Sequence, residues 1–461
     1  MRFDARTALA VFVAVVGVTA CKDRNAETQY AVATTMPVTA ARTAPAEALT
    51  FAQAQALAQQ RQQPLIVDFH APWCYSCYYM ATHVLTGPQW EGVEARSVVF
   101  EVDADSPEGA ALKDQHGIKA LPSYLVLDAA GQELGRILGE QTREDFYAAL
   151  DGMFARSGGI DALAQQVVDD SAASLGAART VLASYHARYD TTGALNWLQA
   201  LPEVAQAAVN ADTTSAAWLA RLRFLQAAKA EDQAACLTQG EAVLKLELGC
   251  ERSYELSRYM DCATKAPDQV IRLKAQRAAA EQLVESRVFG EPRCADERSA
   301  ILAASELQGA VGDRAAQQTL LERAIDRAAE RLDGDLTIDR NLSDNLRVYM
   351  DQLAGVTGDY TAIDALMPQL IAAYPDDYVY AFRHGRSLLR RGKAVEALPF
   401  LEQAAKLAYG INRLTVAEQR VQALIALDRA ADARKVVAEA LKANGPWFAA
   451  EAAKLKAMLP S

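Results

Sequence analysis

The sequence lacks the excess of positive charge that nucleic-acid-binding proteins carry. Its 461 residues include 47 lysines and arginines against 58 aspartates and glutamates, which gives a formal net charge of -11. Clustered positive charge draws proteins to nucleic acid and to anionic lipid, so this balance argues against both kinds of partner. With 51% hydrophobic and 23% charged residues, and a length beyond one hydrophobic core, we expect a globular chain of two or three domains.

Cysteine and histidine are also scarce. Seven cysteines are too few for a small disulfide-dense scaffold, and the five histidines form no His-x3–5-His pair. Only one Cys-x-x-Cys occurs, at Cys74 and Cys77. A structural zinc site needs four ligands, so we expect no metal and no other cofactor.

Long apolar runs are missing except near the N-terminus. Residues 7–20 carry no charge and follow Arg2 and Arg6, a pattern typical of an export signal. These fourteen residues are fewer than the roughly 20 that a helix needs to cross a membrane, so a permanent transmembrane helix is the weaker interpretation. No other segment is long and apolar enough, and we expect the rest of the chain to be soluble.

The end of this segment points to a lipid anchor. Residues 18–21, Val-Thr-Ala-Cys, resemble a bacterial lipobox, which implies that residues 1–21 are a lipoprotein signal peptide and that Cys21 is lipidated. An ordinary cleaved signal with an incidental cysteine is the alternative. By the same resemblance, Lys22 favours the outer membrane. Residues 22–48 are rich in Ala, Thr and Pro and are predicted to be a flexible tether, so the protein would face the periplasm from the cell envelope.

Residues 49–156 alternate between helix and strand signals. An apolar, β-rich run at 65–69 leads directly into the Cys-x-x-Cys turn, which is typical of a buried strand before a functional loop. The order is a βαβ unit followed by a hairpin and a helix, and it predicts an α/β domain. The expected helices are 51–61, 74–85, 108–116 and 142–154, and the expected strands are 65–69, 97–103, 123–128 and 133–138.

Three motifs in this stretch resemble the thioredoxin family. They are Asp68-Phe69, Trp73-Cys74-x-x-Cys77 and Leu121-Pro122-Ser123, in this order and at compatible spacing. The resemblance covers about residues 49–156. Within the family, residues 73–90 look most like the C-terminal periplasmic domain of the DsbD reductase and its relatives. The resemblance implies a thioredoxin fold and thiol-disulfide oxidoreductase activity.

The two motif cysteines are expected to have different roles. Cys74 at the first turn of a helix is expected to be exposed, and unpaired backbone N–H groups and the helix dipole there stabilise its thiolate. It is therefore the predicted nucleophile. Cys77 lies three residues on, on the same helical face, and is the predicted resolving thiol that attacks the mixed disulfide. A disulfide that merely staples the loop is the plainer alternative.

Asp68 and Pro122 complete the predicted catalytic site. A carboxylate on a buried strand needs a role or a partner, and by resemblance Asp68 helps to deprotonate Cys77; capping of local backbone is the alternative. Pro122 stands where a strand ladder would use an N–H, which marks a boundary or a special peptide bond. By resemblance it is a cis-proline that faces the cysteines and leaves the backbone of Leu121 free to pair with substrate. A trans proline at the start of a strand is the alternative.

Aromatic residues around the motif are candidates for substrate contact. Trp73 and Tyr75 are predicted to bind substrate, within an apolar rim that also includes Tyr78 and Tyr79. Tyr78 or Tyr79 fits the core equally well, because one face of that helix must pack on the sheet. Tyr75-Ser76 matches neither common thioredoxins nor strong oxidases, so the motif leaves the redox direction open.

Residues 157–461 are predicted to form an α-helical repeat domain. Apolar residues recur every three and four positions, and residues 378–445 resemble tetratricopeptide repeats, with small residues such as Gly385, Ala397 and Ala404 where two helices approach. Such repeats form a concave surface that binds polypeptides. A compact helical domain that only supports the redox domain is the alternative. The arginines of residues 383–391 are expected on a solvated face.

Four cysteines remain in this helical region, an even number in an oxidising compartment. If helices near 231–246, 251–261 and 268–287 run antiparallel, Cys236 and Cys262 meet at one end of the layer, and Cys250 and Cys294 meet at the other. We therefore expect the disulfides Cys236–Cys262 and Cys250–Cys294 in addition to Cys74–Cys77.

The sequence thus predicts an enzyme, a membrane-tethered thiol-disulfide oxidoreductase that exchanges disulfides with protein substrates. The resemblance alone favours the reductase or isomerase direction, with electrons from a membrane donor such as a DsbD-type protein. An inner-membrane donor fits poorly with an outer-membrane anchor. The alternative is an interaction or scaffold lipoprotein, in which the helical array recruits a partner and the Cys74/Cys77 pair is structural or regulatory.

Overall fold

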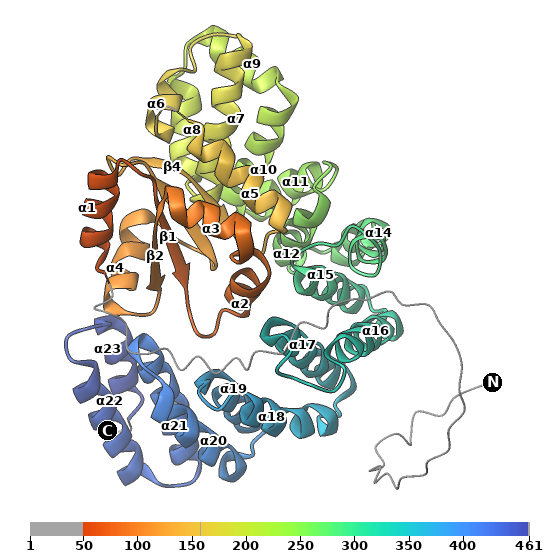
Figure 1. The fold of residues 1–461 in the computed structure, drawn as a ribbon. Helices are drawn as coiled ribbons and strands as arrows, with labels where there is room; N and C mark the ends of the chain where they lie inside the picture. The colour runs from red at the N-terminus through yellow and green to blue at the C-terminus, as the bar shows by residue number, and fades with distance from the viewer. Residues whose placement is uncertain (1–48, 157, 460–461) are drawn as a thin grey trace, which may run out of the picture. The chain divides into compact units, whose positions relative to one another are not determined.

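The computed structural model describes residues 49–156 and 158–459. The predicted signal peptide, the lipidation site Cys21 and the tether lie outside the described residues. Within the described part, the N-terminal domain is built on a four-stranded sheet (Figure 1). Its strands are β1 (Leu65–His70), β2 (Val98–Asp103), β3 (Ser123–Leu127) and β4 (Glu133–Leu138), in the order β2-β1-β3-β4.

The central strand β1 lies between a parallel and an antiparallel neighbour. It pairs in parallel with β2, where Asp68 stands opposite Glu101, and antiparallel with β3, where Asp68 stands opposite Tyr124. β3 and β4 form an antiparallel hairpin. A parallel pair needs a crossover connection, and the chain between β1 and β2 supplies it as helices.

Helices cover both faces of this sheet. They are α1 (Phe51–Arg61), α2 (Tyr75–Tyr79) with a π-helical turn (Met80–Val84), α3 (Gly87–Arg96), α4 (Pro107–His116) and α5 (Arg143–Phe154). Leu65, Val67 and Phe69 of β1 pack in one core with residues of α1 and α4, whereas Ile66 packs on the opposite face with residues of α3 and α5. Because successive strand residues point to opposite faces, the continuous apolar run of β1 fills both cores.

The predicted elements of this domain occur in the predicted order, with one addition. Helix α3 was not predicted; Pro88 stands in its first turn, a position where the missing N–H of proline costs no hydrogen bond. The helix expected over 74–85 is divided into α2 and the π-helical turn.

The rest of the described chain is helical, and residues 158–459 contain no strand. Its α-helices are α6 (Ile160–Gln165), α7 (Ala172–Ala187), α8 (Thr191–Ala200), α9 (Glu203–Ala211), α10 (Thr213–Lys229), α11 (Gln233–Val243), α12 (Arg252–Ala263), α13 (Gln269–Lys274), α14 (Arg277–Arg287), α15 (Glu297–Ala310), α16 (Arg314–Leu332), α17 (Arg340–Thr357), α18 (Thr361–Ala373), α19 (Tyr378–Arg390), α20 (Ala394–Leu407), α21 (Gly410–Ala426), α22 (Ala430–Asn444) and α23 (Ala449–Ala457), with a 3-10 turn at Gly249–Glu251.

Small residues let neighbouring helices of this region approach closely. A Cβ atom added to Gly385 on α19 would lie 2.7 Å from Leu401 Cγ and 3.1 Å from the carbonyl oxygen of Ala397, both on α20. Any larger side chain at this position would push the two helices apart. The small residues of the repeat-like pattern therefore stand at a helix–helix contact, as the sequence predicts.

Two disulfides link neighbouring segments in the middle of the helical region. Cys236 on α11 is joined to Cys262 on α12, with 6.0 Å between the Cα atoms, and Cys250 is joined to Cys294, with 5.6 Å. This is the connectivity that the predicted helix geometry favours. Among the described residues, no helix has both the length and the apolar character that crossing a membrane requires.

Candidate functional site

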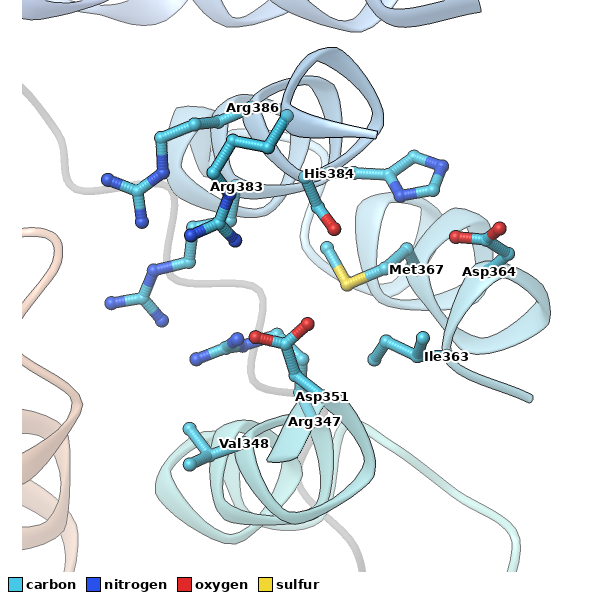
Figure 2. A pocket seen from close by; sticks show the side chains of 11 residues that line it. Arg347, Val348, Asp351, Ile363, Asp364, Met367, Arg383, His384 and Arg386 are labelled. Carbon is cyan, nitrogen blue, oxygen red and sulfur yellow. The ribbon is translucent and has the colours of Figure 1, made fainter. Parts of the chain in front are cut away.

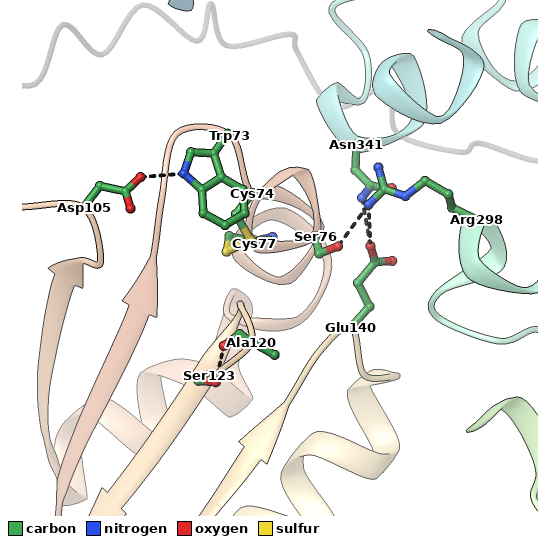
Figure 3. The surroundings of a disulfide bond; sticks show 10 residues. All are labelled: Trp73, Cys74, Ser76, Cys77, Asp105, Ala120, Ser123, Glu140, Arg298 and Asn341. Carbon is green, nitrogen blue, oxygen red and sulfur yellow. Dashed lines mark hydrogen bonds and ion pairs between the residues drawn. A yellow bond between two sulfur atoms is a disulfide. The ribbon is translucent and has the colours of Figure 1, made fainter. Parts of the chain in front are cut away.

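Cys74 and Cys77 form a disulfide directly after the central strand. β1 ends at His70, a short loop follows, and Cys74 is the N-cap residue of α2 (Figure 3). The backbone N–H of Cys77 donates a hydrogen bond to Cys74 Sγ over 3.2 Å. In the reduced protein, the same N–H at the start of the helix stabilises a thiolate on Cys74 over the thiol. This geometry supports Cys74 as the nucleophile.

Cys74 is less exposed than the sequence predicts. Only 4% of its surface is accessible, whereas Trp73 is 38% exposed and Cys77 is half-buried. The prediction of an exposed Cys74 is therefore wrong for this disulfide form. The reason is tertiary: the neighbouring residues of Cys74 are packed against the helical region, as the contacts of Tyr75 and Ser76 show below.

Among the residues that the structure describes, the Asp68 carboxyl group has no hydrogen-bond partner. Its Oδ1 atom is closed to solvent and makes no hydrogen bond. Burial raises the pKa of Asp68 to about 8, and the negative charge of Glu101 adds to the effect. An ordinary thiol has a pKa of about 8.5, so a proton can pass between such a thiol and Asp68 at little cost. The predicted role of Asp68 toward Cys77 is compatible with this pKa and stays a prediction.

The Leu121–Pro122 peptide bond is cis, as the family resemblance implies. The carbonyl oxygen of Pro122 accepts a hydrogen bond from the N–H of Gly139 over 2.9 Å. Leu121 is half-buried, and its backbone groups make no hydrogen bond within the described residues. They are thus available to an extended polypeptide. Figure 3 shows the flanking residues Ala120 and Ser123 in the surroundings of the disulfide.

The helical region holds the side chain of Tyr75. The Tyr75 hydroxyl donates a hydrogen bond to Asp377 Oδ2 over 2.9 Å, and its ring lies 5.3 Å from the ring of Tyr380. The guanidinium of Arg383 lies 5.1 Å from the Tyr75 ring, and Arg340 also donates to Asp377 Oδ2, over 2.6 Å. With 2% of its surface accessible, Tyr75 lies inside the contact between the two regions. Sequence reasoning placed Tyr75 at the substrate surface, and the structure places it in this contact instead.

Ser76 is held by a second group of charged residues. Arg298 of α15 donates to Ser76 Oγ over 3.1 Å and lies 3.8 Å from Glu140, and Asn341 donates to Glu140 over 3.1 Å (Figure 3). Burial, together with the negative charge of Asp296, raises the pKa of Glu140 to about 8. The pKa of Glu140 is thus raised although Arg298 lies beside it, because burial outweighs the attraction of that guanidinium.

Asp344 is the ionised carboxylate at the centre of this group. It is 1% exposed and accepts hydrogen bonds from Arg298 over 3.0 Å, Arg347 over 2.6 Å and Arg383 over 2.8 Å. Burial by itself would raise its pKa, but Arg347 and Arg383 outweigh burial and lower the pKa of Asp344 to about 2. One buried carboxylate thus faces three guanidinium groups.

The third contact reaches Trp73 through Asp105. The indole Nε1 of Trp73 donates to Asp105 Oδ2, and Asn412 of α21 donates to the same oxygen over 3.0 Å. Tyr409 donates its hydroxyl proton to Asp103 at the end of β2. Three residues that flank Cys74, namely Trp73, Tyr75 and Ser76, are therefore connected to different parts of the helical region, Trp73 through Asp105.

Sequence reasoning missed the residues that make these contacts. They are Arg298, Arg340, Asn341, Asp344, Asp377, Arg383 and Asn412. The sequence shows that residues 341 and 343–345 are polar, but only the structure shows that these positions at the start of α17 are buried. Nothing in the sequence says which distant residue each of them meets. In the described part of the chain, no cluster of three or more potential ligands for a metal ion was found.

Comparison with known proteins assigns the N-terminal domain. A family model described as a thioredoxin-like domain matches residues 51–154. Residues 51–154 are a thioredoxin-like domain. This domain is similar to the thiol:disulfide interchange protein DsbD of Neisseria meningitidis, with 32% identity over 94 residues that cover 20% of this chain and 16% of that protein. The chain thus spans less than a fifth of the length of that relative.

Two solved structures are also similar to parts of the chain. A thioredoxin from Thermus thermophilus has 33% sequence identity, covers 24% of this chain and 87% of its own, and has a TM-score of 0.23. The TPR domain of P58(IPK) has 16% identity, covers 69% of this chain and 87% of its own, and has a TM-score of 0.20. The predicted fold class, a thioredoxin-like α/β domain followed by a long helical region, is confirmed.

Proposed function

We propose that this protein is a thiol-disulfide oxidoreductase that reduces or isomerises disulfides of client proteins through Cys74 and Cys77. The observation that carries the proposal is the disulfide at the start of α2, with the Cys77 N–H directed at Cys74 Sγ. Two further features support it: the free backbone of Leu121 and the unpartnered carboxyl group of Asp68. The similarity to DsbD supports the same chemistry.

The proposed reaction has two exchange steps. The Cys74 thiolate attacks one sulfur of the client disulfide, a Cys74–client disulfide forms, and the first client thiolate leaves. Asp68, as the carboxylate, accepts the proton of Cys77, whose thiolate attacks Cys74 Sγ and releases the second client thiolate. Two electrons pass to the client, and the protein is left with the Cys74–Cys77 disulfide. A membrane thiol-disulfide donor of the DsbD type would restore the dithiol.

The proposed location is the periplasmic side of the cell envelope, with an outer-membrane lipid anchor favoured. It rests on the lipobox-like residues 18–21 and on Lys22. Cys21→Ser should move the protein from the membrane fraction to the soluble fraction and leave disulfide exchange intact. Continued membrane association of this variant in the absence of detergent would contradict the lipid anchor.

A redox titration of the full-length chain tests the direction. A midpoint potential of the Cys74/Cys77 pair near about -270 mV supports a reductase, and one near about -120 mV contradicts it. In parallel, the dithiothreitol-regenerated protein should reduce the interchain disulfides of insulin, and Cys74→Ser should abolish this turnover. Turnover that survives Cys74→Ser would contradict the proposed site.

One observation favours a second candidate function. Cys74 is almost closed to solvent, and the residues around it are bound to the helical region. These contacts suit an interaction protein in which the disulfide stabilises the contact between the two regions. That function requires that the purified protein turn over no protein disulfide, and that reduction of Cys74–Cys77 change the affinity for a partner.

A further inference from the structure

Two cavities adjoin the redox site on the side of the helical region. The first, which we call the tryptophan cavity, has a volume of about 170 Å³ and is lined by Trp73 and by residues of α19 and α21. The second, the arginine cavity, has a volume of about 240 Å³ and lies between α17, α18 and α19 (Figure 2). Arg383 and Arg386 line both cavities, so the two are neighbours.

The tryptophan cavity is mainly apolar and lies next to the reactive cysteines. Val379, Phe382 and Val416 line it, and the amide of Asn412 and the hydroxyl of Thr415 add polar groups. Trp73, the residue before Cys74, is the exposed aromatic side chain of the motif. A segment whose cysteine reaches Cys74 can place a neighbouring apolar side chain here.

The arginine cavity has an excess of positive charge in a chain that is acidic as a whole. Four arginines line it, Arg347, Arg383, Arg386 and Arg390, and the last three are spaced along one face of α19. Asp351 is one carboxylate that lines the cavity. Asp344 is nearby on α17 and forms ion pairs with Arg298, Arg347 and Arg383. The other acid of the lining, Asp364, is bound bidentately by Arg391.

Two of these arginines form no ion pair with any residue that the structure describes. Within the described residues, Arg386 and Arg390 make no ion pair and donate no side-chain hydrogen bond. Figure 2 shows Arg383 and Arg386 on α19, across the cavity from Arg347 and Asp351 on α17. Burial lowers the pKa of Arg386, and so do the charges of Arg390, Arg383 and Arg347. Bringing an anion into the cavity would relieve this repulsion.

One arginine of the arginine cavity, Arg383, directly contacts the redox motif. Arg383 lies 5.1 Å from the ring of Tyr75, the residue after Cys74. Arg383 and Arg390 are seven residues apart on α19, a rise of about 10 Å, which an extended chain at about 3.3 Å per residue spans in about three residues. The sequence predicts a solvated face for these arginines; the structure places Arg383 in the contact between the two regions instead.

We propose that the two cavities form a docking groove for an extended, acidic segment of the client protein, which places the client cysteine at Cys74 and its carboxylates among Arg383, Arg386 and Arg390. This inference rests on the proposed function and names its substrate class. A nucleic acid or an anionic lipid surface is large enough to be repelled by the negative charge of the rest of the chain. A single peptide segment needs to contact only the groove.

Two matched peptides test the groove. Each contains one cysteine in a 2-pyridyl mixed disulfide and the same apolar neighbours, with three glutamates in one peptide and three glutamines in the other. Attack by the Cys74 thiolate on the peptide sulfur forms a Cys74–peptide disulfide and releases pyridine-2-thione; Cys77 then releases the peptide thiol. The measured quantity is the second-order rate constant of thione release by the full-length chain, reduced beforehand with dithiothreitol.

The acidic peptide should react about tenfold faster than the neutral one at low salt, and the ratio should approach one at high salt. Arg386→Gln should lower the ratio about threefold, and Arg390→Gln should lower it as well. The matched control is Arg434→Gln, an exposed arginine of α22 that forms no ion pair in the described part of the chain, which should leave the ratio unchanged. Because the ratio compares the rate constants of two peptides with the same variant, an effect of the substitution on folding or on Cys74 reactivity cancels.

The outcomes separate the two proposals. If the wild-type protein reacts equally fast with both peptides, the groove is wrong and the proposed function stands. If it reacts with neither peptide, the proposed function is wrong. If Arg434→Gln lowers the ratio as much as Arg386→Gln does, the preference reflects the general field of the protein and the groove is wrong.

Discussion

The thioredoxin-like domain and the helical region contribute to the same site by different means. The domain supplies Asp68, Cys74, Cys77 and Pro122 from short motifs, and two apolar cores position them. The helical region supplies charged and polar side chains that are far away in the sequence, such as Arg298 and Asp377. Apolar cores tolerate many partners, whereas a buried charge needs an opposite charge beside it, so we expect the second kind of contact to favour one arrangement of the two regions.

This difference bears on how the site works. In the proposed reaction, the thiol chemistry needs only the domain, because the proposed nucleophile, resolving thiol and proton acceptor all come from it. The helical region limits access, since it binds the residues on either side of Cys74. We infer that the domain sets which bond reacts and the helical region sets which client reaches it.

The first prediction isolates the chemistry of the domain and has the largest effect. Cys77→Ala should convert the protein into a trap, because a client bound to Cys74 has no resolving thiolate to release it. Disulfide-linked adducts should accumulate from undetectable amounts to a major fraction of the protein on non-reducing gels. The double variant Cys74→Ser/Cys77→Ala is the control and should form none. Absence of adducts in cells that carry Cys77→Ala would contradict the exchange mechanism.

The second prediction isolates the charged centre of the helical region. Asp344→Asn would leave three guanidinium groups around a neutral side chain, so we expect a loss of about 3–5 kcal/mol in the free energy of unfolding. Urea unfolding of the full-length chain measures it. Asp326→Asn, on the exposed face of α16, is the matched control and should change stability by less than about 0.5 kcal/mol. Equal effects of the two variants would contradict the role of Asp344.

The third prediction uses the raised pKa of Asp68. Its pKa is about 8 in the folded protein and about 4 in the unfolded chain, so the folded state binds more protons between these values. Its contribution to stability is therefore complete below pH 4 and is lost as the pH rises toward 8. From pH 6 to pH 8, wild type should lose up to about 2 kcal/mol more stability than Asp68→Asn does. Parallel stability curves for the two proteins would contradict the raised pKa.

The fourth prediction concerns the contact between the two regions and has the smallest effect. Tyr75→Phe removes the hydrogen bond to Asp377, a change of about 1–2 kcal/mol that should loosen the cover over Cys74. In the reduced protein, alkylation of Cys74 at neutral pH should become severalfold faster. Tyr189→Phe, whose hydroxyl makes no hydrogen bond in the described residues, is the control. Unchanged alkylation in Tyr75→Phe would show that the helical region does not limit access.

Much of the fold and of the site could be predicted from local signals. The apolar run of β1, the Cys-x-x-Cys turn and the Leu-Pro-Ser motif each act within a few residues, so their strands, helices and cis-proline follow from the sequence and the family resemblance. Helix α3 was missed because its apolar pattern is weak and only Val93 is buried. The cysteine pairs of the helical region were predictable because antiparallel helices bring their ends together.

The sequence by itself thus determined the two folds and indicated the Cys74–Cys77 pair and the disulfide connectivity, because propensity, periodicity and short motifs are local properties of the chain. Only the tertiary structure decided that Cys74 is covered, that Tyr75 lies between the two regions and that Arg383 meets both Asp344 and Tyr75. Those facts depend on pairs of residues as far as 308 positions apart, such as Tyr75 and Arg383, and the free energy of a buried polar group depends on its partner in space.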